Sequence, residues 1–334
     1  MHGAAPFSVS ASADGKLIAT AAGDHTVRLW DTSDGHQIGL FRPPFNGENG
    51  GETREAALSP DGKLLATSGP SGEPDTFGKK PYLYIYDAMT GAVVNRLGPL
   101  PDNIQDMEFS PDGKYLAAGL VRQGVLMWTA PFTAPPKSDS RFENYTTVWD
   151  VDFDRFGHLF AAGGDGSIRL YDMDLKPLAK AGLPHGGIPL SIAVNKDNSR
   201  LAIGYKDEAR VDVLSLPDFK KADGPDLSFV SFGDLSQVEW SRSGETLYAS
   251  GTYWDKALDK FQLYGFDRKG TAKPRVLGIE VAIESVCRTP PHVHLRQVLV
   301  EVPIRRSSLN CNDRRSLLKL CQCAAETCGG RFDG

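Results

Sequence analysis

The chain has 334 residues and carries 37 Lys and Arg against 42 Asp and Glu, a formal net charge of −5. This balance argues against a nucleic-acid-binding protein, which needs a basic stripe to replace phosphate counterions. No apolar run is long enough to span a bilayer, and the first residues lack the basic and apolar regions of a secretory signal. We therefore expect a globular, cytoplasmic protein that binds neither nucleic acid nor membrane.

One phrase recurs along the chain and predicts its organisation. An alternating apolar run leads into a Ser-Pro-Asp-Gly-Lys turn or a variant of it, then a Leu-x-Ala segment and a Gly/Asp turn, then a second alternating run that ends in an aromatic residue. Four copies are clear, and two weaker copies follow them. The turn positions of the six copies are Gly15, Gly62, Gly113, Gly157, Asn198 and Gly244. They recur every 41 to 51 residues, close to the ~40–45 residues of a four-stranded propeller blade.

The repeating unit is predicted to consist of strands, because apolar and polar residues alternate with a period of two. The Pro-Asp-Gly stretch is typical of a tight turn: Pro fixes φ, Asp bonds nearby backbone, and Gly accepts positive φ. Such strands cannot bury both faces alone, whereas radial stacking of blades buries them and leaves only short edges. The sequence therefore predicts an all-β fold, a β-propeller of four-stranded antiparallel blades with six clear blades plus a divergent or incomplete seventh.

The repeats resemble the WD-repeat family of β-propellers over roughly residues 2–277. The resemblance rests on Trp30-Asp31, on Tyr86-Asp87 and Tyr171-Asp172 at matching positions, and on the repeated Ser-Pro-Asp-Gly-Lys turns. It also extends to the propeller regions of bacterial multidomain proteins, which are joined to caspase-like or signalling domains.

In that family a His, a Ser or Thr, an Asp and a Trp form a hydrogen-bonded tetrad within a blade. The resemblance implies this structural tetrad in copy one, where the residues are His2, Thr20, Asp24 and Trp30. His185 falls at the matching His position of copy five, without a Trp. Most other copies have lost the His, and several have Tyr in place of Trp.

Residues 278–334 differ in composition from residues 1–277. They contain all five cysteines and a single aromatic residue, Phe332, and Arg outnumbers Lys by 7 to 1. We expect a propeller domain at 1–277 and an atypical Cys/Arg-rich tail at 278–334. Three interpretations of the tail stay open: a remnant of the seventh blade, a disordered appendage, or a frame-shifted segment. Because copy one starts at the N-terminus, we expect either a poorly closed ring of seven positions or a fragment.

The first residues of the inner strands predict a partner-binding face. Alignment of the copies places six residues at one equivalent position: Phe7, Arg54, Gln105, Trp149, Leu190 and Ser236. The resemblance implies that residues near this position touch partners, and Trp and Arg are enriched at binding hot spots. Two enlarged loops between the second and third strands, at 70–81 and from 251 onward, belong to the same face. The predicted partner-binding residues are Phe7, Arg54, Gln105, Trp149, Tyr253 and Trp254, with a protein as the partner. Two alternatives stay open: Trp149 packs between blades, and the loops are merely tolerated insertions.

No motif of catalysis or phosphate binding is found, neither Gly-x-Ser-x-Gly nor His-Glu-x-x-His nor a phosphate loop. The alternating aspartates of 150–154 do not form a calcium loop, because Arg155 and Ala161 stand where Gly and Glu are required. The His and Cys residues of the tail lack zinc-site spacing. Nothing in the repeats places a set of His or carboxylates in the central channel.

We therefore predict a non-enzymatic protein-interaction scaffold that needs no cofactor and no metal. Two alternatives remain. The chain is the sensor or regulatory portion of a larger multidomain effector, or it is a propeller enzyme, similar to a lactonase or dehydrogenase, with a site in the channel.

Overall fold

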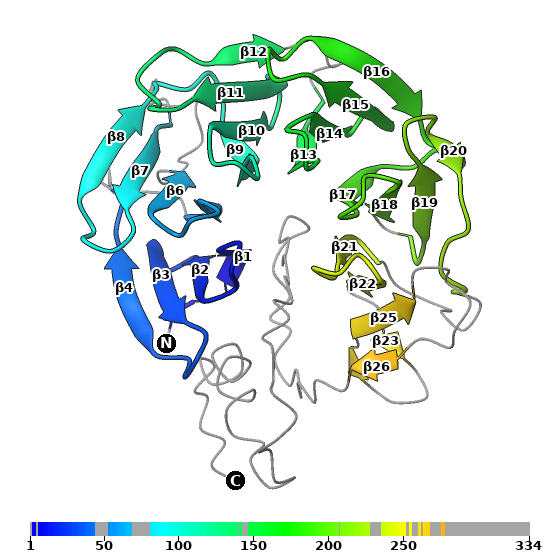
Figure 1. Cartoon of the computed structure of the whole chain (residues 1–334), viewed down its shortest axis with the longest axis horizontal. Coiled ribbons are helices and arrows are strands. Elements are labelled where there is room, and N and C mark those ends of the chain that lie inside the picture. Colours follow the sequence, from blue (N-terminus) through cyan, green and yellow to red (C-terminus); the bar gives the residue numbers. More distant parts are fainter. Residues whose placement is uncertain are drawn as a thin grey trace, which may run out of the picture.

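A computed structural model describes residues 2–4, 6–43, 53–68, 81–139, 141, 146–206, 208–227, 235–251, 254–255, 260–261, 263–267 and 275–277, the last four ranges as backbone only. These residues form six four-stranded antiparallel sheets and one two-stranded sheet. The six sheets follow one another in chain order around a common axis (Figure 1). The predicted β-propeller with six clear blades is therefore confirmed, whereas residues 278–334, assigned to a seventh blade or a tail, lie outside the described residues.

Each blade is a meander that begins at the axis and ends at the rim (Figure 1). Blade 1 contains β1 (Pro6–Ala11), β2 (Leu17–Ala22), β3 (Thr26–Asp31) and β4 (Gln37–Phe41). Blade 2 contains β5 (Ala56–Leu58), β6 (Leu64–Ser68), β7 (Leu83–Asp87) and β8 (Val93–Leu97). Blade 3 contains β9 (Ile104–Phe109), β10 (Tyr115–Leu120), β11 (Val125–Thr129) and β12 (Lys137–Asp139).

The other three blades repeat this plan. Blade 4 contains β13 (Val148–Phe153), β14 (Leu159–Gly163), β15 (Ser167–Tyr171) and β16 (Pro177–Gly182). Blade 5 contains β17 (Pro189–Val194), β18 (Arg200–Tyr205), β19 (Val211–Ser215) and β20 (Lys220–Lys221). Blade 6 contains β21 (Gln237–Trp240), β22 (Thr246–Ser250), β25 (Leu263–Asp267) and β26 (Arg275–Leu277). The hairpin of β23 (Trp254–Asp255) and β24 (Lys260–Phe261) lies between β22 and β25 in the chain.

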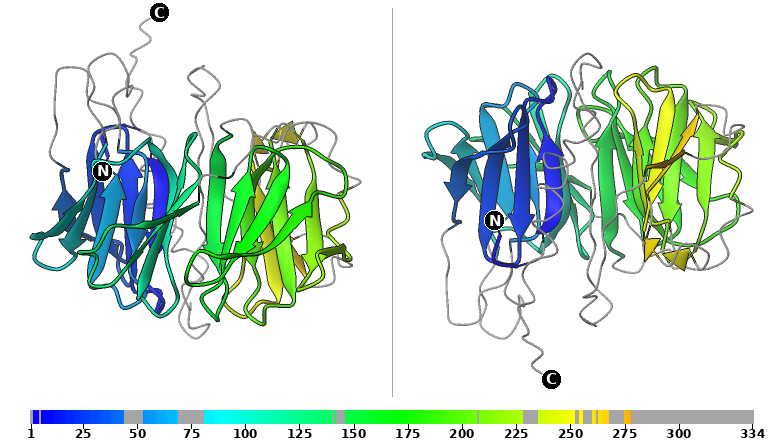
Figure 2. Two further views of the ribbon diagram at one scale, coloured as in Figure 1. Left: turned by 90° about the horizontal axis from the view of Figure 1, so that it is seen from above. Right: turned by 90° about the horizontal axis from the view of Figure 1, so that it is seen from below.

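The described strands of blades 1 and 6 stand apart in Figure 1, so the six blades form an open arc. The side views in Figure 2 show that the strands end at two opposite faces. We call the face that carries the second-to-third-strand turns and the blade-to-blade connections the loop face. We call the opposite face, with the first-to-second and third-to-fourth-strand turns, the turn face. Among the described residues, no helix has the length and apolar character needed to cross a membrane.

The predicted first-to-second-strand turns have the expected backbone. The residue at the key position has a positive φ in all six blades, from 59° at Asn198 to 88° at Gly157. Only Gly adopts this region without strain, and Asn is among the residues that tolerate it best. This explains why Asn198 replaces Gly in copy five without loss of the turn.

The hydrophobic core lies between the blades and not within them. Five clusters of buried side chains each combine residues of two consecutive blades. One example joins Leu29 and Phe41 of blade 1 to Leu65 and Tyr86 of blade 2, with the two rings 5.4 Å apart. A single blade cannot bury its faces alone, so each blade depends on its neighbours for stability.

Candidate protein-interaction face

A β-bulge marks the start of the inner strand in four blades. Between consecutive paired residues the register skips one residue of β1, β9, β13 and β17, and the skipped residues are Phe7, Gln105, Trp149 and Leu190. These four residues belong to the set of six that the sequence alignment placed at one equivalent position. A bulge redirects the side chain of the extra residue and often occurs beside functional sites.

Phe7 lies at the loop face of blade 1. Its ring packs against the turn at Gly23, where an added Cβ would be 3.2 Å from the Phe7 Cε2 atom. The guanidinium of Arg54, at the equivalent position of blade 2, lies 5.9 Å from the centre of the same ring. Phe7 is half-buried and Arg54 is exposed, so this contact is open to a partner. The structure thus brings two of the predicted binding residues together across a blade boundary.

Trp149 occupies the corresponding place in blade 4. Its indole Nε1 lies 2.9 Å from the position of an added Cβ on Gly164, in the turn after β14. The ammonium group of Lys206, which follows β18 in blade 5, lies 5.6 Å from the centre of the Trp149 ring. Trp149 is half-buried, so it both packs against its own blade and presents a surface at the loop face.

The remaining predicted positions differ in accessibility. Gln105 is half-buried, whereas Leu190 and Ser236 are each only 7% exposed and are closed to a partner. Trp254 belongs to the backbone of β23, opposite Phe261 of β24. Its side chain, Tyr253 and most of the enlarged loop at 70–81 lie outside the described residues.

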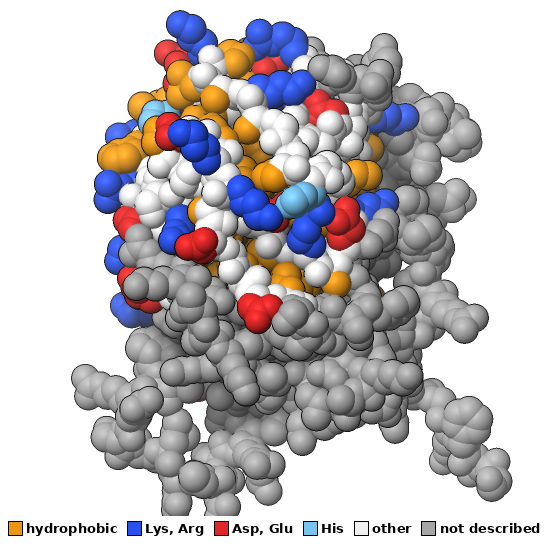
Figure 3. All heavy atoms as spheres, turned by 90° about the vertical axis from the view of Figure 1, so that its right-hand side faces the viewer, with side chains coloured by type: hydrophobic (Ala, Val, Ile, Leu, Met, Phe, Trp, Pro, Cys, Tyr) orange, Lys and Arg blue, Asp and Glu red, His pale blue; other side chains and the backbone are white. Residues whose placement is uncertain are grey.

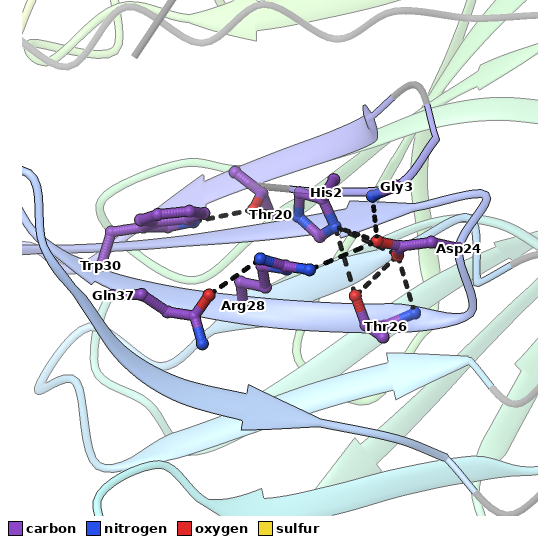
Figure 4. Close-up of polar contacts among 8 residues, drawn as sticks. All are labelled: His2, Gly3, Thr20, Asp24, Thr26, Arg28, Trp30 and Gln37. Atoms are coloured by element: carbon purple, nitrogen blue, oxygen red, sulfur yellow. Dashed lines mark hydrogen bonds and ion pairs between the residues drawn. The ribbon is translucent and has the colours of Figure 1, made fainter. Parts of the chain in front are cut away.

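The predicted tetrad of blade 1 forms one chain of hydrogen bonds (Figure 4). The Trp30 Nε1 donates to Thr20 Oγ1 over 2.9 Å, and Thr20 Oγ1 lies 2.7 Å from His2 Nε2. His2 Nδ1 lies 3.1 Å from both carboxylate oxygens of Asp24. Because a carboxylate only accepts, His2 carries its proton on Nδ1 and accepts from Thr20.

Further donors converge on Asp24. The Thr26 hydroxyl donates to it over 2.6 Å, the Gly3 backbone N–H over 2.7 Å, and Arg28 lies at 3.6 Å. Burial opposes ionisation of Asp24, but the hydrogen bonds from Thr26, Gly3 and His2 outweigh it and hold its pKa below the usual value. Burial lowers the pKa of His2, which is 4% exposed. The cluster therefore ties the segment before β1 to the turn after β2.

Replacing Thr20 by Val is expected to lower the free energy of unfolding by about 1–2 kcal/mol. The substitution keeps the shape but leaves Trp30 Nε1 without its acceptor and His2 Nε2 without its donor. Urea unfolding of the variant measures the loss. The matched control is Thr129→Val at the exposed end of β11, where a change within about 0.5 kcal/mol is expected. Equal losses in the two variants would contradict the role of Thr20.

Other blades hold their polar clusters with different residues. In blade 4, Asp165 accepts from Arg169 over 2.7 Å and from Ser167 over 2.7 Å. In blade 5, the Tyr205 hydroxyl donates to Asp212 over 2.7 Å, and Arg210 lies 4.0 Å from the centre of the Tyr205 ring. These carboxylates are buried beside a cation, which offsets the cost of removing them from water.

His185 does not occupy a tetrad position in blade 5, contrary to the sequence alignment. It is exposed, and its Nε2 lies 2.8 Å from Lys221 Nζ on the surface. Blade 5 has a different polar contact, in which the Tyr205 hydroxyl donates to Asp212 of β19.

The inner strands carry a set of carboxylates, which corrects the expectation that the repeats place none at the axis. Asp106 and Glu108 of β9 accept the Val151 and Phe153 N–H groups of β13 at 2.8 and 3.3 Å. Asp150 and Asp152 of β13 accept the Ile192 and Val194 N–H groups of β17 at 2.8 and 2.6 Å. Serines do this at two other boundaries: Ser10 accepts from Leu58 over 2.9 Å, and Ser191 accepts from Val238 over 3.4 Å.

These side chains satisfy backbone donors that the free edges of the inner strands would otherwise leave unpaired. The alternating aspartates of 150–154, which fail as a calcium loop, therefore have a structural role in the contact between blades. The signal in the sequence was the recurrence of an acidic residue, one intervening residue and a second acidic residue, in two equivalent strands. Among the described residues no group of three or more His, Cys, Asp or Glu is arranged to hold a metal ion.

Two carboxyls on the inner strands have raised pKa values. Burial raises the pKa of Asp152, and the negative charge of Asp106 raises it further. The hydrogen bond from the Val194 N–H acts in the opposite direction and lowers it. Burial, reinforced by the charge of Asp152, raises the pKa of Glu239 on β21 to about 8. The carboxyls of blades 3, 4 and 6 therefore influence one another across the axis.

Comparison with known proteins relates two segments of the chain to one family. The model of the WD domain, G-beta repeat (WD40) matches residues 2–31 and 137–172. The first segment holds the tetrad of blade 1, and the second runs from β12 through β15 and includes Trp149.

Several curated proteins are similar to parts of the chain. A guanine nucleotide-binding protein subunit beta from Arabidopsis thaliana is 32% identical over 119 residues, which cover 34% of this chain and 29% of that protein. Transcription initiation factor TFIID subunit 5 from Caenorhabditis elegans is 24% identical over 201 residues, 52% of this chain and 31% of that protein. The target of rapamycin complex subunit wat1 from Schizosaccharomyces pombe is 24% identical over 196 residues, 56% and 55% respectively. The matches thus span about a third to a half of these relatives.

Among solved structures, the β-propeller domain of Cps50 (Swd1) from Myceliophteria thermophila superposes with a TM-score of 0.62 at 16% identity. The match covers 83% of this chain and 87% of that domain, and it supports the fold alone. The chain is thus a β-propeller that contains segments matching the WD domain, G-beta repeat (WD40) in blade 1 and across blades 3 and 4.

Proposed function

We propose that this propeller is a non-enzymatic scaffold whose loop face binds a protein partner. The observation that carries the proposal is a repeated contact at that face, in which a half-buried aromatic ring lies beside a cation of the next blade. The two contacts are Phe7 with Arg54 and Trp149 with Lys206. Aromatic and Arg side chains of this kind supply much of the binding energy at protein interfaces.

The loop face presents these rings on a rigid support. Phe7 and Trp149 each rest on a glycine of the turn beside them, and each occupies a bulge in a paired strand. Side chains that are already fixed lose little conformational entropy when a partner binds. The flank that carries β16 and β20 is different, because basic, acidic and apolar side chains interleave there without a large area of one kind (Figure 3).

The names of the three relatives support a role within assemblies. Each is called a subunit: of a guanine nucleotide-binding protein, of a transcription initiation factor and of a target of rapamycin complex. A scaffold role for this chain is consistent with that pattern and needs neither cofactor nor metal.

The double substitution Trp149→Ala/Lys206→Ala is expected to weaken partner binding at least about tenfold while the fold is kept. Affinity capture from source cells, with quantitative mass spectrometry, first identifies the protein most enriched by the unaltered chain. Calorimetric titration of that purified protein then measures the affinity of each variant. The matched control is Val93→Ala/Val94→Ala on the exposed outer strand β8. If the affinity for the captured protein does not change on loss of Trp149 and Lys206, the proposal is wrong.

A further inference from the structure

The turn between the first and second strands has the same polar design in five blades. At its third position an Asp or Ser oxygen accepts the backbone N–H two residues later, over 3.0 to 3.3 Å. At its first position a Ser or Asn oxygen accepts the N–H that begins the second strand, over 2.8 to 3.0 Å. The third-position residues are Asp14, Asp61, Asp112, Asp197 and Ser243.

Blade 4 departs from this design. Its third position is Phe156, which has no side-chain acceptor, and its first position is Asp154. Asp154 alone accepts the Phe156 and His158 N–H groups, at 2.8 and 2.9 Å, and also bonds His158 Nδ1 at 2.8 Å. Asn198 of blade 5 donates to the same carboxylate over 2.9 Å. Asp154 therefore stabilises this turn without a side-chain acceptor at the third position, and the Phe156 ring lies edge-on to His158 with the ring centres 6.2 Å apart.

Phe156 is presented to solvent at the turn face. It is 58% exposed, and Met173 beside it is 40% exposed. The Met173 Sδ lies 3.3 Å from an added Cβ on Gly157, so the Met173 side chain lies across the same turn. An exposed aromatic ring and a methionine on a fixed turn are the side chains that interfaces favour.

The charged residues around Phe156 and Met173 indicate what kind of partner these two side chains can bind. The Arg155 guanidinium lies 4.6 Å from the centre of the Phe156 ring, and among the described residues Arg155 forms no ion pair. The two aspartates on either side of Met173 have partners of their own: Asp172 accepts from the Lys176 backbone N–H, and Asp174 pairs with Lys137 at 2.5 Å. An Arg that is stacked on a ring keeps its N–H donors free for a carboxylate.

We propose that Arg155, Phe156 and Met173 form a second docking site, on the turn face, for an acidic peptide segment with an aliphatic or aromatic anchor residue. The anchor packs between Phe156 and Met173, and a neighbouring carboxylate of the peptide accepts from Arg155. This site lies at the opposite end of the strands from Trp149, so it is independent of the loop-face proposal.

The test uses the full chain and a synthetic probe, an acetylated octapeptide of alternating leucine and glutamate with a fluorophore. Saturable binding is expected at concentrations below about 1 mM. Peptides of alternating leucine and lysine, or of serine and glutamate, are expected to bind at least about tenfold more weakly. Phe156→Ser, which installs the residue found in blade 6, is expected to weaken binding at least about tenfold. Arg155→Ser is expected to weaken binding and to flatten its dependence on salt.

The matched control is Met89→Ser, since Met89 is 68% exposed in a turn of blade 2 on the same face. Its affinity for the probe is expected to equal that of the unaltered chain. Thermal midpoints within about 2 °C of one another establish that all variants are folded. Absence of saturable binding up to about 1 mM, or equal affinity of the Phe156→Ser and Met89→Ser variants, overturns the proposal.

Discussion

Replacing Gly204 by Ala is expected to lower the free energy of unfolding by about 3 kcal/mol. Gly204 is the second-last residue of β18, and an added Cβ would lie 2.7 Å from the carbonyl oxygens of both Leu235 and Ser236. These oxygens belong to the backbone that leads into blade 6, so no side-chain rotation relieves the clash. Either blade 6 moves away from blade 5 or the strands distort. Because the core lies between blades, that movement also opens the cluster of Val213, Val238 and Trp240.

Gly182→Ala is the matched control for this prediction. Gly182 ends the outer strand β16, and no atom lies within 4 Å of its added Cβ. This variant is expected to keep its stability or to gain up to about 1 kcal/mol, because Ala loses less conformational freedom than Gly. Urea unfolding followed by tryptophan fluorescence compares the two variants. A Gly204→Ala protein as stable as Gly182→Ala would show that the blades are not held at the spacing described here.

The arrangement of blades follows from the sequence because its determinants are local. Period-two alternation, a turn residue with positive φ and an aromatic at the end of the third strand are each visible within one copy. The tetrad of His2 and Trp30 is also local to one copy, so the resemblance was sufficient to predict its members. In contrast, residues 278–334 do not contain the repeat, so these local signals do not extend to them.

The sequence was less informative about contacts that cross from one blade to the next. Alignment located the position of Phe7 and Trp149, but the bulge that redirects these side chains leaves no mark in the residue types. The pairing of Asp152 with the Val194 N–H joins strands 42 residues apart. Predicting it requires the register between blades, which periodicity does not supply. Phe156 differs from the residues at the third position of the other turns, but its 58% exposure and the replacement of that position by Asp154 are properties of the folded chain.

The inner-strand carboxyls make stability depend on pH in the direction opposite to that of a carboxylate whose pKa is lowered on folding, such as Asp24. Glu239 has a pKa of about 8 in the folded chain, against a reference value of 4.5. Between these values the folded protein binds more protons than the unfolded chain, so the free energy of unfolding falls as pH rises. Asp152 acts with the same sign, because burial also raises its pKa.

Glu239→Gln is therefore expected to stabilise the protein at pH 9 by on the order of 2–4 kcal/mol and to change it little near pH 4.5. The amide oxygen of Gln can still accept the Trp240 N–H, which Glu239 accepts at 2.9 Å, and it does so without a charge. Thermal midpoints from pH 4.5 to 9 measure the effect. The midpoint of the unaltered chain should fall further below that of the variant as pH rises. The matched control, Glu245→Gln, removes the same charge from the exposed turn of blade 6 and is expected to run parallel to the unaltered chain. If Glu239→Gln also runs parallel to it, Glu239 is already ionised in the folded protein, and the carboxyls at the axis are solvated rather than buried.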